Sequence, residues 1–223
     1  MDEKVRQILE NTPFWNKMED WQRKLLLQNS RLINYQAGDR VYSGAGECLG
    51  MIFILEGSLR TYLLSDEGKE VTMYRLGKGD TCVLAASCIL SAITFEVEIQ
   101  AQEPTKALVL PAGMLARLTE ENVYLENFIY KEAAKRFSDV VEALQQMMFF
   151  SLTQRVAAFL LDESAKKKTL VISMTHEEIA RMIGSAREAV SRILKEMVKK
   201  GWIALNRGEI KIRNKGELYR ILE

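Results

Sequence analysis

Long apolar runs, cysteine and histidine are all scarce in this chain of 223 residues. No apolar run reaches the roughly 18 residues that a membrane-spanning helix needs, and the charged N-terminus is unlike a signal peptide. The three cysteines are an odd number, which fits a reducing compartment better than a disulfide scaffold. We therefore expect a cytoplasmic protein that does not contact a membrane.

The single histidine, His176, narrows the range of enzymes that this chain could be. A metal-binding cupin needs several histidines, and a thiol hydrolase needs a cysteine paired with a histidine base. The chain also lacks a glycine-rich loop of the P-loop type. We expect no enzymatic activity and no set of metal ligands, and we expect His176 to support a helix start or a phosphate contact.

Charge is distributed unevenly along the chain, although the total is close to balance. The segment from Ser151 to the end holds 15 basic and 9 acidic residues, whereas the first 150 residues hold 16 basic and 21 acidic ones. This difference indicates a polyanionic partner for the C-terminal part only.

Residues 175–199 carry the pattern of a helix-turn-helix. Thr175 is a favourable N-cap, and Glu178 three residues later completes a capping box for a first helix. Gly184 then tolerates the positive φ of a tight turn. The second helix, over 186–199, has an apolar face and a polar face, and in a helix-turn-helix the polar face enters the major groove of double-stranded DNA. Its expected buried positions are Ala189, Val190, Ile193, Leu194 and Met197. The alternative is an ordinary helical hairpin with a solvated face.

A β-hairpin is predicted to follow the second helix. Residues 202–205 and 209–213 alternate as short strands do, and Asn206-Arg207-Gly208 suits the loop between them. A hairpin in this position is a wing, which braces the helix and can touch the sugar-phosphate backbone. Residues 151–223 are therefore predicted to form a winged helix-turn-helix domain.

The first 118 residues are predicted to form a β-roll sensor domain with an N-terminal helix. Residues 3–29 are helical in pattern, and their expected anchors are Trp15, Trp21, Leu25 and Leu26. From Asn34 onward, short strands separated by glycine turns indicate a small barrel or roll. The expected strands are 41–42, 51–55, 58–62, 71–76, 94–100 and 107–110.

A long helix is predicted to begin near Glu120 and to fill residues 119–150. Apolar side chains recur along it at steps of four and three, which is the rhythm of a two-stranded coiled coil. These seam positions are Tyr130, Ala134, Phe137, Val141, Leu144 and Met148. We expect a homodimer, because a winged helix that reads a palindrome works best as a pair. The alternative is a helix packed on its own domain, which Phe128, Val140 and Met147 beside the seam would serve.

In this order and length, the roll, the long helix and the winged helix resemble the Crp/Fnr transcription regulators over essentially the whole chain. The matching pieces are Gly57-Ser58-Leu59-Arg60, Gly79-Asp80, Thr153-Gln154-Arg155-Val156-Ala157-Ala158-Phe159-Leu160, Ile179-Ala180, Ile183-Gly184, Arg187-Glu188, Val190 and Ser191-Arg192. The resemblance implies an α+β fold with a cyclic-nucleotide-binding-like jelly roll, a dimerisation helix and a DNA-binding domain. It also implies transcription regulation, with RNA polymerase as a further partner.

In the family, the positions that match Arg187, Glu188, Ser191 and Arg192 face base edges. The chemistry agrees, because arginine pairs with guanine O6 and N7 and glutamate accepts from the cytosine amino group. The chain combines the residues of the catabolite-activator and oxygen-sensor branches, so the resemblance implies a half-site related to TGTGA or TTGAT. Expected backbone contacts come from Thr175, His176, Ser185, Lys195, Lys199 and Arg207. One local alternative is a capping box between Ser185 and Glu188, which would divert Glu188 from the bases.

Residues 81–96 depart from the cyclic-nucleotide binders of the family. Those proteins carry a Gly-Glu pair shortly after the match to Gly79-Asp80 and an Arg-Ser pair further on, whereas this segment has no arginine and its acidic residue comes late. A cyclic phosphate buried without a cation binds poorly, so we expect no cAMP binding. An iron–sulfur cluster of the oxygen-sensor type needs four thiolates, and the chain has only three cysteines.

Cys82 and Cys88 lie six residues apart in the region of the effector site. They could form a redox pair, ligate haem or another metal, or be small buried hydrophobic side chains. No cofactor is predicted and the effector stays open. A signal at the roll would shift the population of arrangements of the long helices. The alternative is a roll that senses nothing and only scaffolds the dimer.

Overall fold

The computed structural model describes residues 2–43, 48–86 and 96–223, and the chain divides into two compact units. The first unit comprises Met1–Leu63 and Met73–Val140, and the second comprises Leu64–Thr72 and Val141–Glu223. The long helix α4 (Val123–Phe149) belongs to the first unit at its start and to the second at its end. The division into domains 1–118, 119–150 and 151–223 stays a prediction. Within the described residues, no helix has the length and apolar character needed to cross a membrane.

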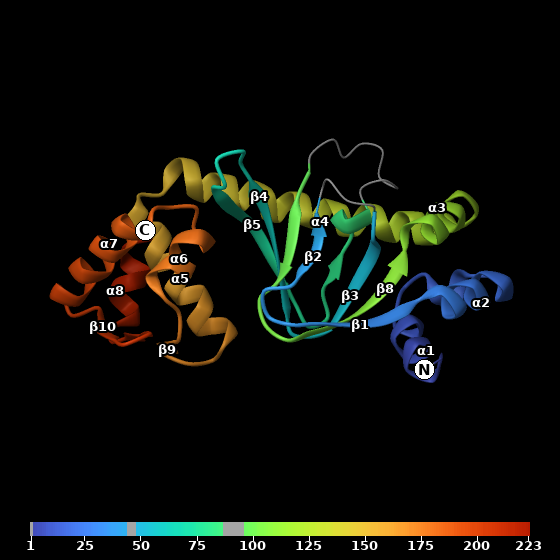
Figure 1. Cartoon of the computed structure of the whole chain (residues 1–223), viewed down its shortest axis with the longest axis horizontal. Helices are drawn as coiled ribbons and strands as arrows, with labels where there is room; N and C mark the ends of the chain where they lie inside the picture. The colour runs from blue at the N-terminus through green and yellow to red at the C-terminus, as the bar shows by residue number, and fades with distance from the viewer. Residues whose placement is uncertain (1, 44–47, 87–95) are drawn as a thin grey trace. The chain divides into compact units, whose positions relative to one another are not determined.

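The first unit contains a β-roll of two four-stranded sheets (Figure 1). One sheet has the order β2-β7-β4-β5 and the other has the order β1-β8-β3-β6. The strands are β1 (Arg31–Tyr35), β2 (Arg40–Ser43), β3 (Gly50–Glu56), β4 (Ser58–Leu64), β5 (Glu70–Gly77), β6 (Thr81–Cys82), β7 (Glu98–Ala101) and β8 (Thr105–Pro111), and the short 3-10 helix η2 (Leu84–Ala86) follows β6. The predicted roll is confirmed, although the start of the expected strand 94–100 lies partly outside the described residues.

The N-terminal segment is not the single helix that the pattern of residues 3–29 predicts. It forms α1 (Asp2–Glu10), the 3-10 helix η1 (Trp15–Lys17) and α2 (Asp20–Asn29). The interruption contains Pro13, which lacks an amide donor and disfavours helical backbone in the residue before it.

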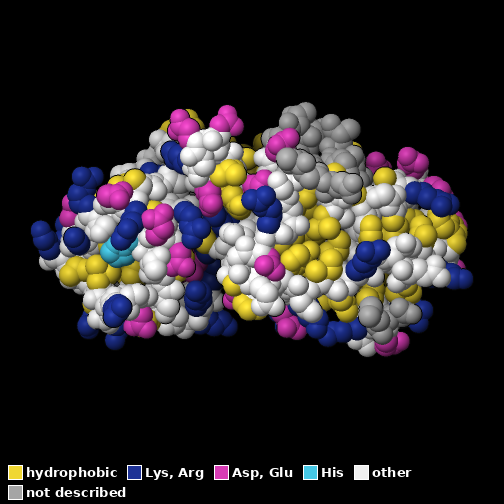
Figure 2. All heavy atoms as spheres, in the orientation of Figure 1, with side chains coloured by type: hydrophobic (Ala, Val, Ile, Leu, Met, Phe, Trp, Pro, Cys, Tyr) yellow, Lys and Arg dark blue, Asp and Glu magenta, His cyan; other side chains and the backbone are white. Residues whose placement is uncertain are grey.

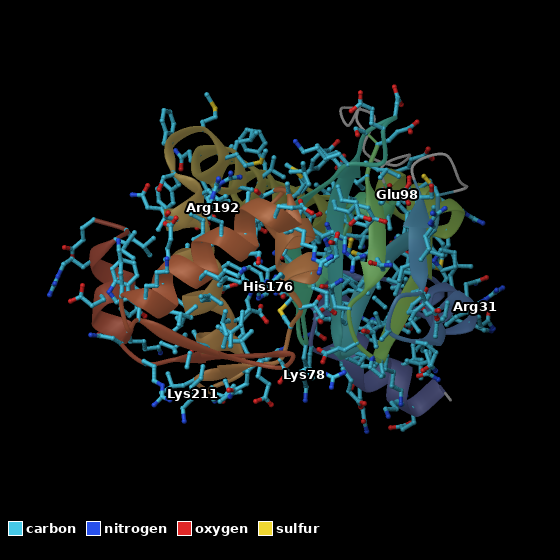
Figure 3. All side chains as sticks on the ribbon, turned by 60° about the vertical axis from the view of Figure 1, so that its left-hand side comes forward. Arg31, Lys78, Glu98, His176, Arg192 and Lys211 are labelled. Atoms are coloured by element: carbon cyan, nitrogen blue, oxygen red, sulfur yellow. The ribbon has the colours of Figure 1, made fainter. Side chains whose placement is uncertain are left out.

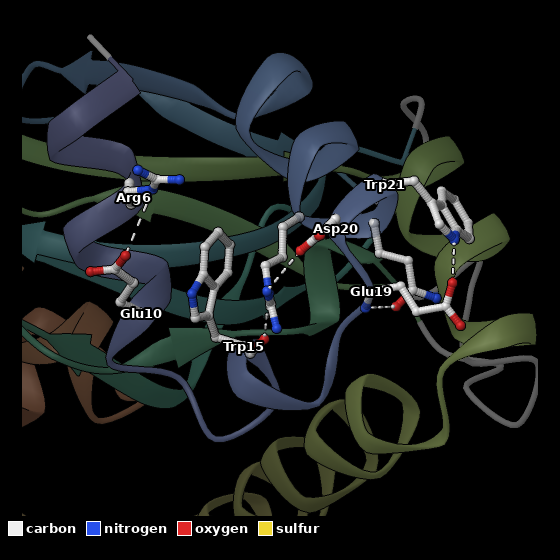
Figure 4. Close-up of polar contacts among 8 residues, drawn as sticks. Arg6, Glu10, Trp15, Glu19, Asp20 and Trp21 are labelled. Carbon is white, nitrogen blue, oxygen red and sulfur yellow. Dashed lines mark hydrogen bonds and ion pairs between the residues drawn. The ribbon is translucent and has the colours of Figure 1, made fainter.

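Polar contacts fix the start of α2 (Figure 4). Glu19 is the N-cap, and its backbone N–H donates to Gln22 Oε1 at 3.0 Å. The Trp21 indole N–H donates to Glu19 Oε2 at 2.8 Å. Trp21 therefore remains 38% exposed, and the prediction that it anchors the core is wrong, whereas Trp15 and Leu26 are buried as predicted.

A break at Asn122 separates α3 (Ala112–Glu121) from α4, so the long helix begins a few residues later than predicted. The Asn122 side-chain oxygen accepts from the backbone N–H of Tyr124 at 3.1 Å and of Leu125 at 3.0 Å. These bonds satisfy amide donors that a helix start leaves without intrahelical partners. The first third of α4 then packs through Leu125 and Ile129 into the hydrophobic core of the first unit.

The second unit contains the predicted winged helix-turn-helix. Its elements are α5 (Leu152–Lys166), β9 (Val171–Ile172), α6 (His176–Met182), α7 (Arg187–Lys199), β10 (Ile203–Asn206), β11 (Glu209–Ile212) and α8 (Lys215–Arg220). The wing strands β10 and β11 form the predicted hairpin, and β9 adds a third strand in the order β10-β11-β9. One hydrophobic core joins α5, α6, α7, the wing and α8.

Candidate nucleic-acid interface

The start of α6 is fixed by the predicted capping box. The backbone N–H of Glu178 donates to the Thr175 hydroxyl at 3.2 Å, and Glu178 Oε2 accepts from the backbone N–H of Thr175 at 2.6 Å. The backbone hydrogen bond from Thr175 lowers the pKa of the Glu178 carboxyl, although partial burial opposes that shift. The capping box therefore fixes the residue at which α6 begins and the path of the chain into the helix.

A tight turn connects α6 to α7. Gly184 has a φ of +62°, as the sequence predicts, and the next amide, that of Ser185, donates to the Ala180 carbonyl at 2.9 Å. This left-handed glycine with a hydrogen bond back to the helix is the Schellman arrangement. The Arg155 guanidinium, from α5, donates to the Ile183 carbonyl at 3.1 Å. Arg155 thus positions the turn, a role that the sequence analysis did not assign to it.

The polar face of α7 is open to solvent, while the apolar face is buried. Val190, Leu194 and Met197 are almost wholly buried, as predicted. The opposite face lines an open hollow formed by Arg187, Glu188, Ser191, Arg192, Lys195, Glu196 and Lys199. The structure therefore brings all four predicted base-reading residues to one surface.

The suggested capping box between Ser185 and Glu188 is not formed. Ala186 is the N-cap of α7, and it makes no side-chain cap hydrogen bond. Glu188 is exposed instead and lines the hollow. Its carboxylate is thus available to accept from a base.

A second pocket links the start of α6 to the turn of the wing. It is lined by Met174, Thr175, His176, Glu177, Arg187, Asn206, Gly208, Glu209 and Ile210. Figure 2 shows the histidine among lysine and arginine side chains, and Figure 3 shows Arg192 on α7 and Lys211 on the wing. Partial burial lowers the pKa of His176, and the positive charges of Arg187 and Lys195 lower it further.

Among the predicted backbone contacts, Lys195 and Lys199 line the α7 hollow, and Thr175 and His176 line the second pocket. Thr175, Lys195, Lys199 and Arg207 are exposed, while His176 and Ser185 are partly buried. Arg207 lies in the turn between β10 and β11, where Asn206 pairs with Glu209. Lys211, on the exposed side of β11, adds a cation that the sequence analysis did not single out.

The predicted seam runs along an exposed stripe of α4. Phe137 is 69% exposed, Leu144 is 45% exposed and Met148 is 73% exposed, and Tyr130 is also exposed. Ala134 is exposed and Val141 is partly buried. An exposed apolar stripe of this extent is unusual on a protein surface unless a partner covers it.

Only one member of the suggested cysteine pair lies within the described residues. Cys82 is a free thiol and is wholly buried, whereas Cys88 belongs to residues 87–95. Cys48 is disulfide-bonded. Because Cys82 is a free thiol, no disulfide joins it to Cys88 in this structure, and a redox or ligand role of the two cysteines stays a prediction. Among the described residues, no group of three or more His, Cys, Asp and Glu side chains is placed to hold a metal ion.

A β-roll followed by a long helix and by a winged helix-turn-helix with a basic recognition helix defines a class of DNA-binding transcription regulators. Comparison with known proteins agrees in both halves of the chain. Residues 32–122 match the cyclic nucleotide-binding domain, and residues 154–221 match the Crp-like helix-turn-helix domain.

The chain belongs to the Crp/Fnr family. A solved structure of a transcriptional regulator of this family from Eubacterium rectale is 37% identical, covers 95% of this chain and 98% of its own, and superimposes with a TM-score of 0.91. The cAMP-activated global transcriptional regulator Vfr of Pseudomonas aeruginosa is 22% identical over 80% of this chain and 87% of its own. The transcriptional activator protein anr of the same organism is 25% identical over 78% of this chain and 73% of its own.

The low pKa of His176 predicts a pH dependence of DNA binding. Free His176 is neutral near pH 7, and a DNA phosphate beside it would raise its pKa, so that binding takes up a proton. Affinity should therefore rise as the pH falls from about 8 to about 6, by up to about tenfold per half-site for each pKa unit between the two states. Fluorescence anisotropy at constant ionic strength measures this slope. His176→Gln should flatten it, and an equal slope in the variant would contradict the assignment.

Proposed function

We propose that this regulator acts as a homodimer and reads a palindromic operator through two copies of α7. The observation that carries the proposal is the open hollow on α7, where two arginines and a glutamate are exposed on one face. Arginine and glutamate read guanine and cytosine, respectively, through the major groove. A half-site related to TGTGA or TTGAT follows from the combination of Arg187, Glu188, Ser191 and Arg192.

The paired hollows set the spacing of the operator. In a dimer of helix-turn-helix domains, the two half-sites lie one helical turn of DNA apart, about 34 Å. The exposed apolar stripe of α4 supports the proposed dimer, because pairing of two α4 helices would bury these side chains away from water. Selection from random duplexes with the full-length protein is the direct test. A selected motif without two-fold symmetry would contradict the proposal.

We propose that base contacts and phosphate contacts are made by different residues of this surface. Arg187, Glu188, Ser191 and Arg192 read bases. Phosphate contacts come from Thr175, His176, Lys199 and Arg207. Phosphate contacts position the protein and make the affinity depend on salt, while base contacts select the sequence. RNA polymerase is the further partner that we infer from the family. Homologues of this chain are regulators, and we propose no catalytic activity.

The roll is proposed to respond to an effector other than cAMP. Residues 81–96 supply no arginine or lysine for a cyclic phosphate. Binding of a signal in the roll would shift the population of α4 arrangements in the dimer, and with it the spacing of the two recognition helices.

Cyclic nucleotides are therefore expected to leave the protein unchanged. A ligand at one hundred times its dissociation constant stabilises a protein by about 2.7 kcal/mol, which is easily seen in a melting curve. Millimolar cAMP and cGMP should shift neither the melting temperature nor the operator affinity. Either shift would show that a cation outside residues 81–96 holds the cyclic phosphate, and would overturn this part of the proposal.

A further inference from the structure

The α7 hollow contains a second carboxylate besides that of Glu188. It belongs to Glu196, which is exposed and lines the hollow together with Arg192 and Lys199. Because α7 is continuous, Glu188, Arg192 and Glu196 follow one another at intervals of four residues, about one turn of the helix. Helical side chains lean towards the N-terminus, so the Glu196 side chain leans back towards the turn that carries Arg192. Its carboxylate therefore belongs to the same surface as the proposed base-reading residues.

The Glu196 carboxylate makes no ion pair or side-chain hydrogen bond within the part of the chain that the structure describes. Arg192, four residues before it, and Lys199, three residues after it, have the spacing of helical ion pairs but form none with it. Lys200, four residues after it, instead has its ammonium 4.5 Å from the centroid of the Trp202 ring. On α5 and α8, by contrast, pairs at these spacings are closed, at 2.9 and 2.7 Å. Glu196 is thus available to accept hydrogen bonds from a bound molecule.

A carboxylate in this position limits which DNA sequences can fill the hollow. When DNA displaces water from Glu196, the carboxylate needs a hydrogen-bond donor in exchange. The phosphates carry negative charge and repel it, so the DNA backbone supplies no such donor. In the major groove the donors are the N4 amino group of cytosine and the N6 amino group of adenine, whereas guanine and thymine present the acceptors O6 and O4.

We infer that Glu196 is a further specificity-determining residue, which accepts a hydrogen bond from the exocyclic amino group of a cytosine or adenine. Guanine and thymine are rejected at that position, because a carbonyl oxygen would face the carboxylate. The base lies one or two pairs from the one that Arg192 reads, since four residues of helix span about 6 Å and stacked bases are about 3.4 Å apart. The inference rests on the proposed function, because it requires α7 to lie in the major groove. It adds one specified base pair to each half-site.

Glu196→Ala distinguishes base reading from simple repulsion by the sign of its effect. If the carboxylate only repels phosphates, its removal should tighten binding to every duplex alike. If it reads a base, its removal should weaken binding to the selected operator by roughly 5- to 150-fold per half-site and abolish the preference at one base pair. We expect the second result, with binding to unrelated duplexes unchanged or tighter. Fluorescence anisotropy of the full-length protein with a matrix of single-base operator variants measures both quantities.

Glu196→Gln tests the hydrogen bond itself. A glutamine keeps nearly the same shape, loses the charge, and pairs best with adenine through N6 and N7. The variant should therefore prefer adenine at that position, whichever amino-bearing base the wild type selects. A side chain that is only part of a solvated helix face would not change the base preference. Glu223→Gln removes the same charge from an exposed residue outside the lining of both pockets, and it should keep the wild-type preference.

Failure of this inference and failure of the proposed function give different results. If the wild-type protein selects no palindromic operator, the proposed function is wrong and the role of Glu196 is wrong with it. If the wild type selects an operator, but Glu196→Ala changes the affinity for all duplexes by one common factor, the proposed function stands and Glu196 reads no base. A wild-type preference for guanine or thymine at the position that Glu196→Ala affects would also overturn the inference.

Discussion

Phe137→Glu is expected to convert the dimer into monomers and to abolish tight operator binding. Phe137 is 69% exposed on α4, in the middle of the apolar stripe that we propose as the seam. The variant would place two like charges in a desolvated interface, where neither has a partner. Two linked half-site contacts gain about 10²–10⁴ in affinity over one, so the operator affinity should fall by a factor of that order. Sedimentation velocity gives the oligomeric state, and fluorescence anisotropy gives the affinity.

The control for this variant adds the same charge one residue away from the seam. Gln145→Glu lies beside Leu144, is exposed and is off the heptad positions. It should remain dimeric, whereas Leu144→Glu should behave like Phe137→Glu. If Phe137→Glu and Leu144→Glu are both still dimers at micromolar concentration, the subunits associate through another surface.

Arg187→Ala and Arg192→Ala are each expected to lose affinity for the preferred operator and to lose preference at one base pair of each half-site. A bidentate arginine–guanine contact contributes about 1–3 kcal/mol of discrimination, so each variant should bind the operator about 5- to 150-fold more weakly per half-site. Binding to unrelated DNA should change far less. A matrix of single-base operator variants, measured with each protein variant, identifies the base that each arginine reads.

Two lysine variants distinguish base reading from general electrostatic attraction to DNA. Lys199→Ala removes a cation at the far end of the hollow and should weaken binding to all sequences alike, with a smaller salt dependence. Lys215→Ala, on α8 and outside the lining of both pockets, should have little effect. The base-reading assignment is wrong if Arg187→Ala and Arg192→Ala, like Lys199→Ala, lower affinity equally for every sequence.

The parts of the fold that the sequence predicted well are those with local signals. Thr175 and Glu178 lie three residues apart and form the capping box, and Gly184 is the residue type that its turn requires. Both features can be predicted from positions that are close together in the sequence. The wing is predicted for the same reason. By contrast, β9 is only two residues long and has no periodicity of its own, so it is visible only through its pairing with β11.

Breaks in helices were harder to predict than the helices themselves. The pattern of residues 3–29 continues across the interruption at Pro13, and hydrophobic periodicity continues from α3 towards α4. Asn122 ends one helix and caps the next through hydrogen bonds that only the folded backbone defines. The exposed position of Trp21 likewise depends on a specific contact, its bond to Glu19.

The recognition surface of α7 and the contact between α4 and the roll differ in how much of each the sequence reveals. The base-reading residues lie within one and a half turns of a single helix, so their spacing alone places them on one face. Tyr74 and Arg136, by contrast, come from β5 and α4, which are far apart in the chain. In the sequence, Arg136 is one more charged residue of an amphipathic helix. Only tertiary structure brings the Arg136 guanidinium carbon to 5.5 Å from the centroid of the Tyr74 ring.

Arg136 and Phe137 are consecutive residues of one helix, and so they point about 100° apart around its axis. One faces the sheet of its own subunit through Tyr74, and the other lies on the exposed stripe. Any turn of α4 about its axis that moves one of these side chains moves the other through the same angle. A rotation of α4 that begins at the roll would therefore rotate the side chains that face the partner subunit, and the helix would need neither to bend nor to stretch.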